Sequence, residues 1–201
     1  MASPRPVVKI TLPKDLEGVK PGELPENLLR PIEGKGKLHH LAADAYEAMD
    51  EAANAEGIDL SPTSQADTYR SLAVQEYGFY QRYTDTPNKK QAKEKPKIYK
   101  GKAWYLKSPK LAPMATPGTS NHNLGLAVDI ANASGKRLEW LTKHAPRFGW
   151  SWEFTSGAEP WHIRYVAGDN VPDAVKEWKA RKAISGESTA PKLCSGCNRP
   201  L

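Results

Sequence analysis

The sequence lacks features that would place it in several large classes of protein. No apolar run approaches the ~18 to 20 residues that a membrane-spanning helix needs, and the N-terminus has no apolar core of the kind found in a signal peptide. Cysteine is nearly absent: Cys194 and Cys197 both fall in the last eight residues, so no disulfide can staple the core. A membrane-spanning helix and a disulfide-built scaffold are therefore excluded.

What is present is typical of a folded protein with a basic surface. The 201 residues are 39% hydrophobic and 26% charged, which suits one domain with extensions. The formal net charge of +6 favours polyanionic partners, and charge alone does not choose between nucleic acid and an anionic wall polymer. Nine lysines and one glutamate lie between Lys89 and Lys110. Tyr99, Trp104 and Tyr105 lie among these lysines. The composition predicts a basic, mobile insertion that is either a solvated loop or a binding surface for anionic polymer or glycan.

The chain divides into three predicted segments. Residues 1–36 are rich in proline and glycine and predict an extended arm, in which only 7–12 resembles a strand. Residues 37–184 form the predicted domain, with the lysine-rich insertion at about 85–115. Residues 185–201 form a polar tail that carries the Cys-x-x-Cys pair.

Hydrophobic periodicity predicts four helices and several short strands within the domain. A helix is expected over 38–56, ended by Gly57, and a second begins after Tyr69-Arg70-Ser71. The other predicted elements are helices at 136–147 and 172–184, a short strand at 58–66, a buried strand at 126–131, and strands at 150–154 and 161–166 paired as a hairpin.

A histidine and an aspartate stand seven residues apart where a turn enters the buried strand. Asp129 lies within the apolar run, where an unpaired carboxylate is costly to bury. A cation must therefore lie beside it. A metal shared with His122 would satisfy both residues, and an ion pair with a lysine or arginine is the alternative.

A second acid and a second histidine occur together at 159–162, in the order Glu-Pro-Trp-His. Two histidines and one carboxylate around zinc leave a fourth position for water, as in catalytic sites, whereas structural zinc sites are closed by four protein ligands. Glu159 would then be free to act as a general base, with His162 as the second imidazole ligand.

These two segments together resemble peptidases of the M15 type, which include D-Ala-D-Ala carboxypeptidases, vancomycin-resistance dipeptidases and phage L-alanyl-D-glutamate endolysins. The pattern Ser-x-His-x-x-Gly-x-Ala-x-Asp is matched in full at 120–129, and Glu-Pro-Trp-His at 159–162. The resemblance covers roughly 38–166. The stretch between Arg70 and His122 is longer and richer in lysine than a minimal member needs, and the arm lies outside the match.

The resemblance implies a fold, a cofactor and roles for particular residues. It implies an α+β fold like that of hedgehog and DD-peptidases, with a small antiparallel sheet that carries the zinc site and helices packed on one side. It implies Zn²⁺ held by His122, Asp129 and His162, and Glu159 as the catalytic base. It also implies that Arg70, in the segment Tyr69-Arg70-Ser71, points at the substrate carbonyl or carboxylate.

Other candidate residues carry weaker signals. Ser120, Tyr69 and Trp161 are candidate substrate contacts, although a serine that only forms a turn fits Ser120 equally. Cys194 and Cys197 have the spacing of half a zinc knuckle, and a shared metal site, a redox pair and an unremarkable tail all remain open. His39 and His40 match no motif and are expected to have no ligand role.

The predicted function is hydrolysis of a peptide bond next to a D-amino acid in the stem peptide of bacterial peptidoglycan, either by an L-alanyl-D-glutamate endopeptidase or by a carboxypeptidase that removes the terminal D-alanine. The absence of a signal peptide and the extra arm favour a phage endolysin or virion-associated lysin, located in the host cytoplasm before lysis or in the virion. Other virion proteins are then possible partners of the arm or the tail. The alternative is a phage tail component that binds wall peptide without cutting it. Nucleic-acid binding has no motif behind it.

Overall fold

The computed structural model describes residues 4–32 and 34–186 of the chain. Within these ranges, no helix is both long enough and apolar enough to cross a bilayer. The helices and strands are β1 (Leu29–Ile32), β2 (Gly36–His39), α1 (His40–Ala55), α2 (Leu72–Arg82), β3 (Tyr83–Thr84), β4 (Lys97–Tyr99), β5 (Lys102–Leu106), β6 (Ala127–Asp129), α3 (Gly135–His144), β7 (Trp150–Ser151), β8 (His162–Tyr165) and α4 (Asp173–Ser185). Six short 3-10 turns complete the described chain: η1 (Lys14–Leu16), η2 (Glu26–Leu28), η3 (Gln65–Asp67), η4 (Gln91–Lys93), η5 (Asn121–Leu124) and η6 (Ala145–Phe148).

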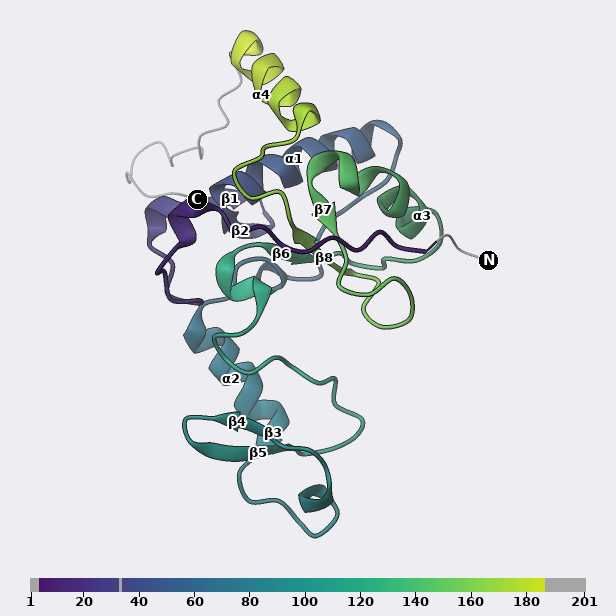
Figure 1. Cartoon of the computed structure of the whole chain (residues 1–201). Helices are drawn as coiled ribbons and strands as arrows, with labels where there is room; N and C mark the ends of the chain where they lie inside the picture. Colours follow the sequence, from purple (N-terminus) through teal and green to yellow (C-terminus); the bar gives the residue numbers. More distant parts are fainter. Residues whose placement is uncertain (1–3, 33, 187–201) are drawn as a thin grey trace.

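A three-stranded antiparallel sheet in the order β6-β8-β7 lies at the centre of the larger lobe. Helices α1, α3 and α4 lie on one side of it (Figure 1). Tyr46 of α1 packs edge-on against Trp150 of β7, and both side chains are fully buried. Each large apolar side chain removed from water in this way stabilises the fold by roughly 1.5–3 kcal/mol. The predicted α+β class, with helices on one side of a small antiparallel sheet, is confirmed.

The N-terminal arm packs along the sheet of its own domain, as the dark purple trace in Figure 1 shows. Val7 and Thr11 form isolated parallel bridges to Trp152 and Ala167, so the predicted strand at 7–12 is reduced to two single contacts. Pro6 and Pro13 flank this segment and limit how far regular pairing could extend, because proline has no N–H to donate. Further along, Leu16 and Leu24 are buried in the same core as α1. The described arm is therefore integrated into the domain.

The lysine-rich insertion folds into a second three-stranded sheet, in the order β3-β5-β4, beside α2. A two-residue turn at Lys100 and Gly101, both with positive φ, connects β4 to β5, as expected for a tight hairpin. Phe79 of α2 is fully buried and stacks on Tyr83 with ring centroids 4.5 Å apart. The aromatic residues thus pack around Phe79, and the insertion contains paired strands where a solvated loop was one of the two interpretations. Its mobility stays a prediction.

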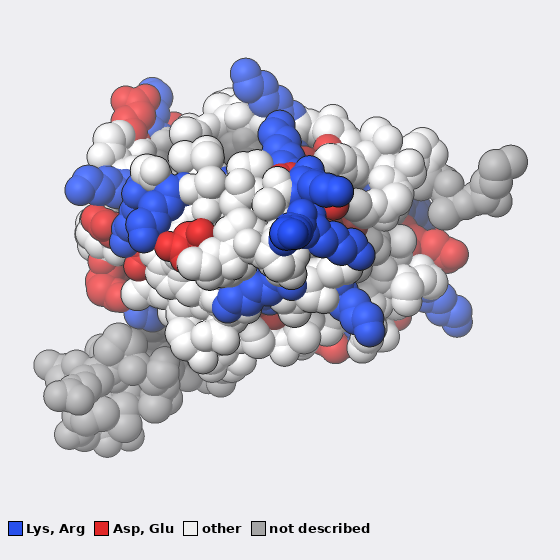
Figure 2. All heavy atoms as spheres, turned by 90° about the horizontal axis from the view of Figure 1, so that it is seen from below, with Lys and Arg blue, Asp and Glu red and all other residues white. Residues whose placement is uncertain are grey.

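The insertion also carries much of the positive charge. Its lobe projects downward in Figure 1, and Figure 2 views the molecule from that side. Lys and Arg side chains are spread over this face among uncharged residues, with fewer acidic ones. The face therefore suits an anionic polymer better than a cationic one.

The predicted helices match the structure closely, whereas a second predicted strand, that at 58–66, does not form. The helix expected over 38–56 is observed as His40–Ala55, and the hairpin of 150–154 with 161–166 is observed as β7 and β8. The segment 58–66 forms only an isolated bridge between Pro62 and Ile130. Pro62 lacks the N–H that a continued ladder would need.

Candidate metal centre and active site

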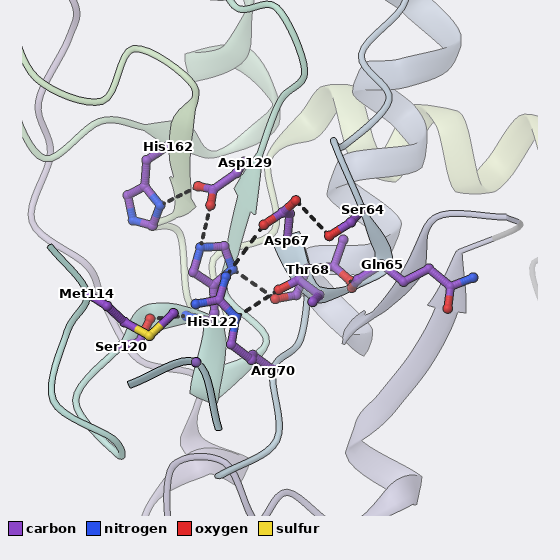
Figure 3. Close-up of polar contacts among 12 residues, drawn as sticks. Ser64, Gln65, Asp67, Thr68, Arg70, Met114, Ser120, His122, Asp129 and His162 are labelled. Atoms are coloured by element: carbon purple, nitrogen blue, oxygen red, sulfur yellow. Dashed lines mark hydrogen bonds and ion pairs between the residues drawn. The ribbon is translucent and has the colours of Figure 1, made fainter. Parts of the chain in front are cut away.

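Three side chains from different parts of the chain converge at one edge of the central sheet (Figure 3). Asp129 ends β6 and pairs in register with His162, the first residue of β8. Because residues directly opposite in an antiparallel pair point to the same face, the carboxylate and the imidazole meet. His122 reaches the same point from η5, and candidate ligand atoms of all three residues lie within 4.8 Å of one another.

The turn that positions His122 is fixed at both ends. Ser120 caps it, since its Oγ accepts a hydrogen bond from the His122 N–H at 3.3 Å. Gly125 ends it in the left-handed conformation, with φ +65°. Its carbonyl accepts the His39 N–H at 3.0 Å, which ties the turn to the start of α1. The cap favours the prediction of Ser120 as a turn-forming serine, and a contact with substrate stays a prediction.

Replacing Gly125 with alanine is expected to destabilise the domain strongly. A Cβ at this position would lie 2.6 Å from the backbone nitrogen of His39, in addition to the cost of a left-handed alanine. We expect the free energy of unfolding to fall by about 3 kcal/mol or more, against about 1–2 kcal/mol for the backbone conformation alone. Gly118→Ala is the matched control, because Gly118 also has a positive φ but has open space around it. Equal losses in urea unfolding of the two variants would contradict this account.

The hydrogen bonds around His122 fix which of its nitrogens faces Asp129. His122 is buried, and its Nδ1 donates to the Thr68 carbonyl at 2.9 Å. In the neutral ring, Nε2 therefore carries a lone pair, and it lies 3.3 Å from Asp129 Oδ2. A lone pair and a carboxylate oxygen repel each other unless a positive charge lies between them. A carbonyl partner on the other nitrogen is also the support that metal-bound histidines usually have.

The Asp129 carboxylate is held ionised by its surroundings. Burial opposes ionisation, but the two imidazoles beside the carboxylate, those of His122 and His162, outweigh it. The pKa of Asp129 therefore lies well below its ordinary value. His162 Nδ1 lies 2.8 Å from Asp129 Oδ1. Asp129 is thus a carboxylate at neutral pH, which is the state that ligates a metal.

The donor set fits a divalent metal such as zinc. A tetrahedral ion with bonds of ~2.1 Å separates its ligand atoms by roughly 3.4 Å. The two imidazole-to-carboxylate distances of 2.8 and 3.3 Å are close to that value, so small side-chain movements suffice. Three protein ligands leave one position for water or substrate.

Arg70 lies beside this cluster, between η3 and α2 (Figure 3). Its guanidinium donates to the Ala66 carbonyl at 2.9 Å and to Gln75 Oε1 at 3.0 Å, and it forms an ion pair with Asp67 at 3.6 Å. Burial lowers the pKa of Arg70, while the attraction of Asp129 and Asp67 opposes that shift. A positive charge is therefore fixed close to the candidate metal ligands.

The structure does not bring Glu159 into the cluster. Glu159 is exposed, and no hydrogen bond or ion pair of its carboxylate is found among the described residues. Its backbone has φ +51°, an unusual conformation for a residue other than glycine, and its carbonyl accepts the His162 N–H at 3.2 Å. Strained backbone of this kind concentrates at functional sites. The role of Glu159 as a base stays a prediction.

A cleft of about 540 Å³ opens beside the cluster. Asp129, Asp67, Asn132 and Trp161 are among its lining residues, and Trp161 is 45% exposed. A larger cleft of about 980 Å³ lies between the arm and α3, but none of the three clustered residues lines it. The smaller cleft is therefore the better candidate for the substrate site, and Trp161 is placed to line it.

Some residues around the site were not predicted, and one predicted contact faces elsewhere. The Tyr69 hydroxyl accepts the Leu24 N–H at 3.2 Å, so it joins the arm to the domain. Thr68 and Gln75 are fully buried supports of His122 and Arg70 that have no sequence motif. A backbone carbonyl such as that of Thr68 leaves no signal in residue type. Cys194 and Cys197 lie outside the described residues.

The site combines a small antiparallel sheet, two histidines, one carboxylate and an adjacent cleft. This combination is typical of metallohydrolases, in which one coordination position of the metal stays open. Residues 35–168 match the family model of the VanY D-alanyl-D-alanine carboxypeptidases. The chain belongs to this family. The predicted M15-type family is thereby confirmed.

Individual relatives agree with this assignment. A D-alanyl-D-alanine carboxypeptidase of Enterococcus faecalis (strain ATCC 700802 / V583) is 34% identical over 122 residues, which are 54% of this chain and 44% of that protein. The solved structure of the LdcB LD-carboxypeptidase superimposes with a TM-score of 0.51 at 24% identity, covering 81% of this chain and 77% of the other. That likeness supports the fold. The chain spans less than half the length of its Enterococcus faecalis relative.

Proposed function

We propose that this chain is a zinc carboxypeptidase that removes the terminal D-alanine from peptidoglycan stem peptides, with His122, Asp129 and His162 as the metal ligands. The observation that carries the proposal is the His122 nitrogen lone pair facing the Asp129 carboxylate, with His162 on the same carboxylate. The match to a family of D-alanyl-D-alanine carboxypeptidases favours this bond.

Residues of the chain supply the remaining chemistry. Bound zinc supplies a Lewis acid that makes water a nucleophile at neutral pH. Glu159 accepts the proton of the attacking water and returns it to the departing amine. It need not contact the ligands before substrate arrives, because catalytic hydrogen bonds often tighten only in the complex. Arg70 attracts the negative charge of the substrate, either the developing oxyanion or the terminal carboxylate.

Defined stem peptides test the proposal directly. A pentapeptide ending in D-Ala-D-Ala is incubated with the protein, with and without chelator, and the products are identified by mass spectrometry. Release of free D-alanine that stops with chelator is the expected result. Cleavage between L-alanine and D-glutamate would replace the carboxypeptidase with an endopeptidase. Binding of the peptide with no cleavage would overturn the enzymatic proposal in favour of a wall-binding component.

The phage-lysin version of the function has less support. A phage lysin was predicted to cut either of the two bonds, so the product of this assay does not identify one. The family match and the Enterococcus faecalis relative are described as carboxypeptidases, and neither is described as a phage protein. The described part of the arm packs on its own domain, so its contacts do not require a virion partner. A role in host lysis or in a virion therefore has no separate observation behind it.

Replacing Arg70 with lysine is expected to lower kcat/KM for the pentapeptide by about 10²-fold, the scale of losing one preorganised donor. Lysine keeps the charge but cannot reproduce the planar set of donors that contacts Ala66, Gln75 and Asp67. Bound zinc should be unchanged. Arg82→Lys is the control, since Arg82 at the C-terminal end of α2 donates to the Gly78 carbonyl and to Met114 Sδ and makes no hydrogen bond to Ala66, Gln75 or Asp67 among the described residues. Unchanged kcat/KM for Arg70→Lys would remove Arg70 from substrate recognition.

A further inference from the structure

A second group of two histidines and one aspartate lies where the N-terminal arm meets α1. Asp15 belongs to η1 on the arm, His39 ends β2, and His40 begins α1. The candidate ligand atoms of these residues lie within 4.8 Å of one another, as they do in the catalytic cluster. Of the described residues, only these two groups meet that criterion.

The change from strand to helix brings the two adjacent histidines together. Successive side chains of a strand point to opposite faces, but the backbone turns from β2 into α1 between these residues. Their ring centroids are 4.4 Å apart. The sequence expectation that this pair has no ligand role rested on the lack of a motif, and Asp15 is too distant in sequence to be part of one.

Both rings present the same nitrogen to the same carboxylate. His39 Nε2 lies 3.0 Å from Asp15 Oδ1, and His40 Nε2 lies 2.7 Å from Asp15 Oδ2. These distances resemble those around Asp129, and a tetrahedral ion with bonds of ~2.1 Å needs ligand atoms roughly 3.4 Å apart. Small outward movements of the three side chains would therefore make room for the ion between them.

One side chain of this group is buried and the other two are partly exposed, which suits an ion that enters from solvent. The His39 side chain is fully buried, whereas His40 and Asp15 are 40% and 35% exposed. One ligand is thus held rigidly by the core, and water can complete the coordination on the open side. We propose that Asp15, His39 and His40 form a second divalent-metal site, of the class that takes Zn²⁺, which clamps the N-terminal arm to the start of α1.

Two features are expected to give this site a lower affinity for zinc than the proposed catalytic site has. His39 Nδ1 is buried and has no hydrogen-bond partner among the described residues, whereas His122 Nδ1 donates to a carbonyl. Loss of such a partner typically lowers metal affinity by about 10–100-fold. The ion would also lie at the N-terminus of α1, where the helix dipole disfavours a cation. Zinc is therefore expected to fill the catalytic site first.

The test is a zinc titration of the full chain after chelator treatment, with Cys194 and Cys197 replaced by serine so that the tail cannot bind metal. Calorimetry should show two equivalents, the second weaker by about 10-fold or more. In the same background, His40→Ala and Asp15→Asn should each lose only the weaker equivalent and keep peptide cleavage. His144→Ala, which replaces another histidine near a helix end, should keep both. His122→Ala should keep the weaker equivalent, which separates this proposal from the catalytic one.

A structural readout accompanies the titration. Zinc should slow trypsin cleavage after Lys14 in the cysteine-free parent, because the ion fixes η1 on α1, and His40→Ala should abolish that protection. One equivalent of zinc in the parent would overturn the proposal, as would two equivalents in both His40→Ala and Asp15→Asn. In either case Asp15, His39 and His40 would form only a hydrogen-bonded contact between the arm and α1, without metal.

Discussion

Replacing Glu159 with alanine is expected to lower kcat for stem-peptide hydrolysis by about 10²–10⁴-fold, the usual scale of losing a general acid-base group. Bound zinc should be unchanged, because the Glu159 carboxylate makes no hydrogen bond or ion pair with His122, Asp129 or His162 among the described residues, and its backbone bond to His162 is kept in alanine. The KM for the pentapeptide should change little. Steady-state kinetics and zinc analysis of the same preparation measure both effects.

Glu153→Ala is the matched control for Glu159. It removes an exposed acid from the same segment, one that reaches only Arg164 at 4.0 Å, and it should leave kcat near the wild-type value. Equal activity of Glu159→Ala and the wild type would remove this residue from the mechanism. Loss of zinc from Glu159→Ala would instead make it a ligand or a support of one.

Replacing His122 with alanine is expected to abolish tight zinc binding and hydrolysis together. The metal supplies several kcal/mol to such reactions, so kcat/KM should fall by about 10³-fold or more. The variant also leaves the buried Thr68 carbonyl without its donor, which costs roughly 1–3 kcal/mol of stability. His122→Gln keeps more of the side-chain volume and a possible donor, so it separates metal loss from unfolding.

The comparison variant for His122 is His144→Ala. His144 stacks on Trp140 of α3 and belongs to neither candidate metal-binding group. It should keep tightly bound zinc and full hydrolysis. A His122→Ala variant that folds, by circular dichroism, and still binds tight zinc would exclude the proposed ligand set.

Local sequence pattern predicted the helices well because their buried faces repeat within the chain itself. Ala42, Ala45, Tyr46 and Met49 recur at helical spacing and are all buried in α1. The insertion was harder to interpret. Nine lysines dominate its composition, whereas its fold depends on Phe79, which lies before that stretch, stacks on Tyr83 and packs against Trp104.

The candidate site residues were likewise predictable from the sequence only in part. The spacing of His122 and Asp129 and the order Glu159 to His162 indicated a metal site from residue types alone. Neither motif contains the supports of the site. Thr68 acts through a backbone carbonyl, and Gln75 acts through Arg70, so nothing in their side-chain types identifies them.

The sequence by itself determined the family, the positions of the helices and the residue types able to hold zinc. Each of these depends on residues that are close together in the chain. Only the tertiary structure decided which nitrogen of His122 faces the metal position, that Asp129 and His162 are partners in register, and that Asp15 meets His39 and His40. These facts depend on contacts between segments distant in sequence. Strand pairing and the packing of the arm fix such contacts, and neither is encoded by local spacing.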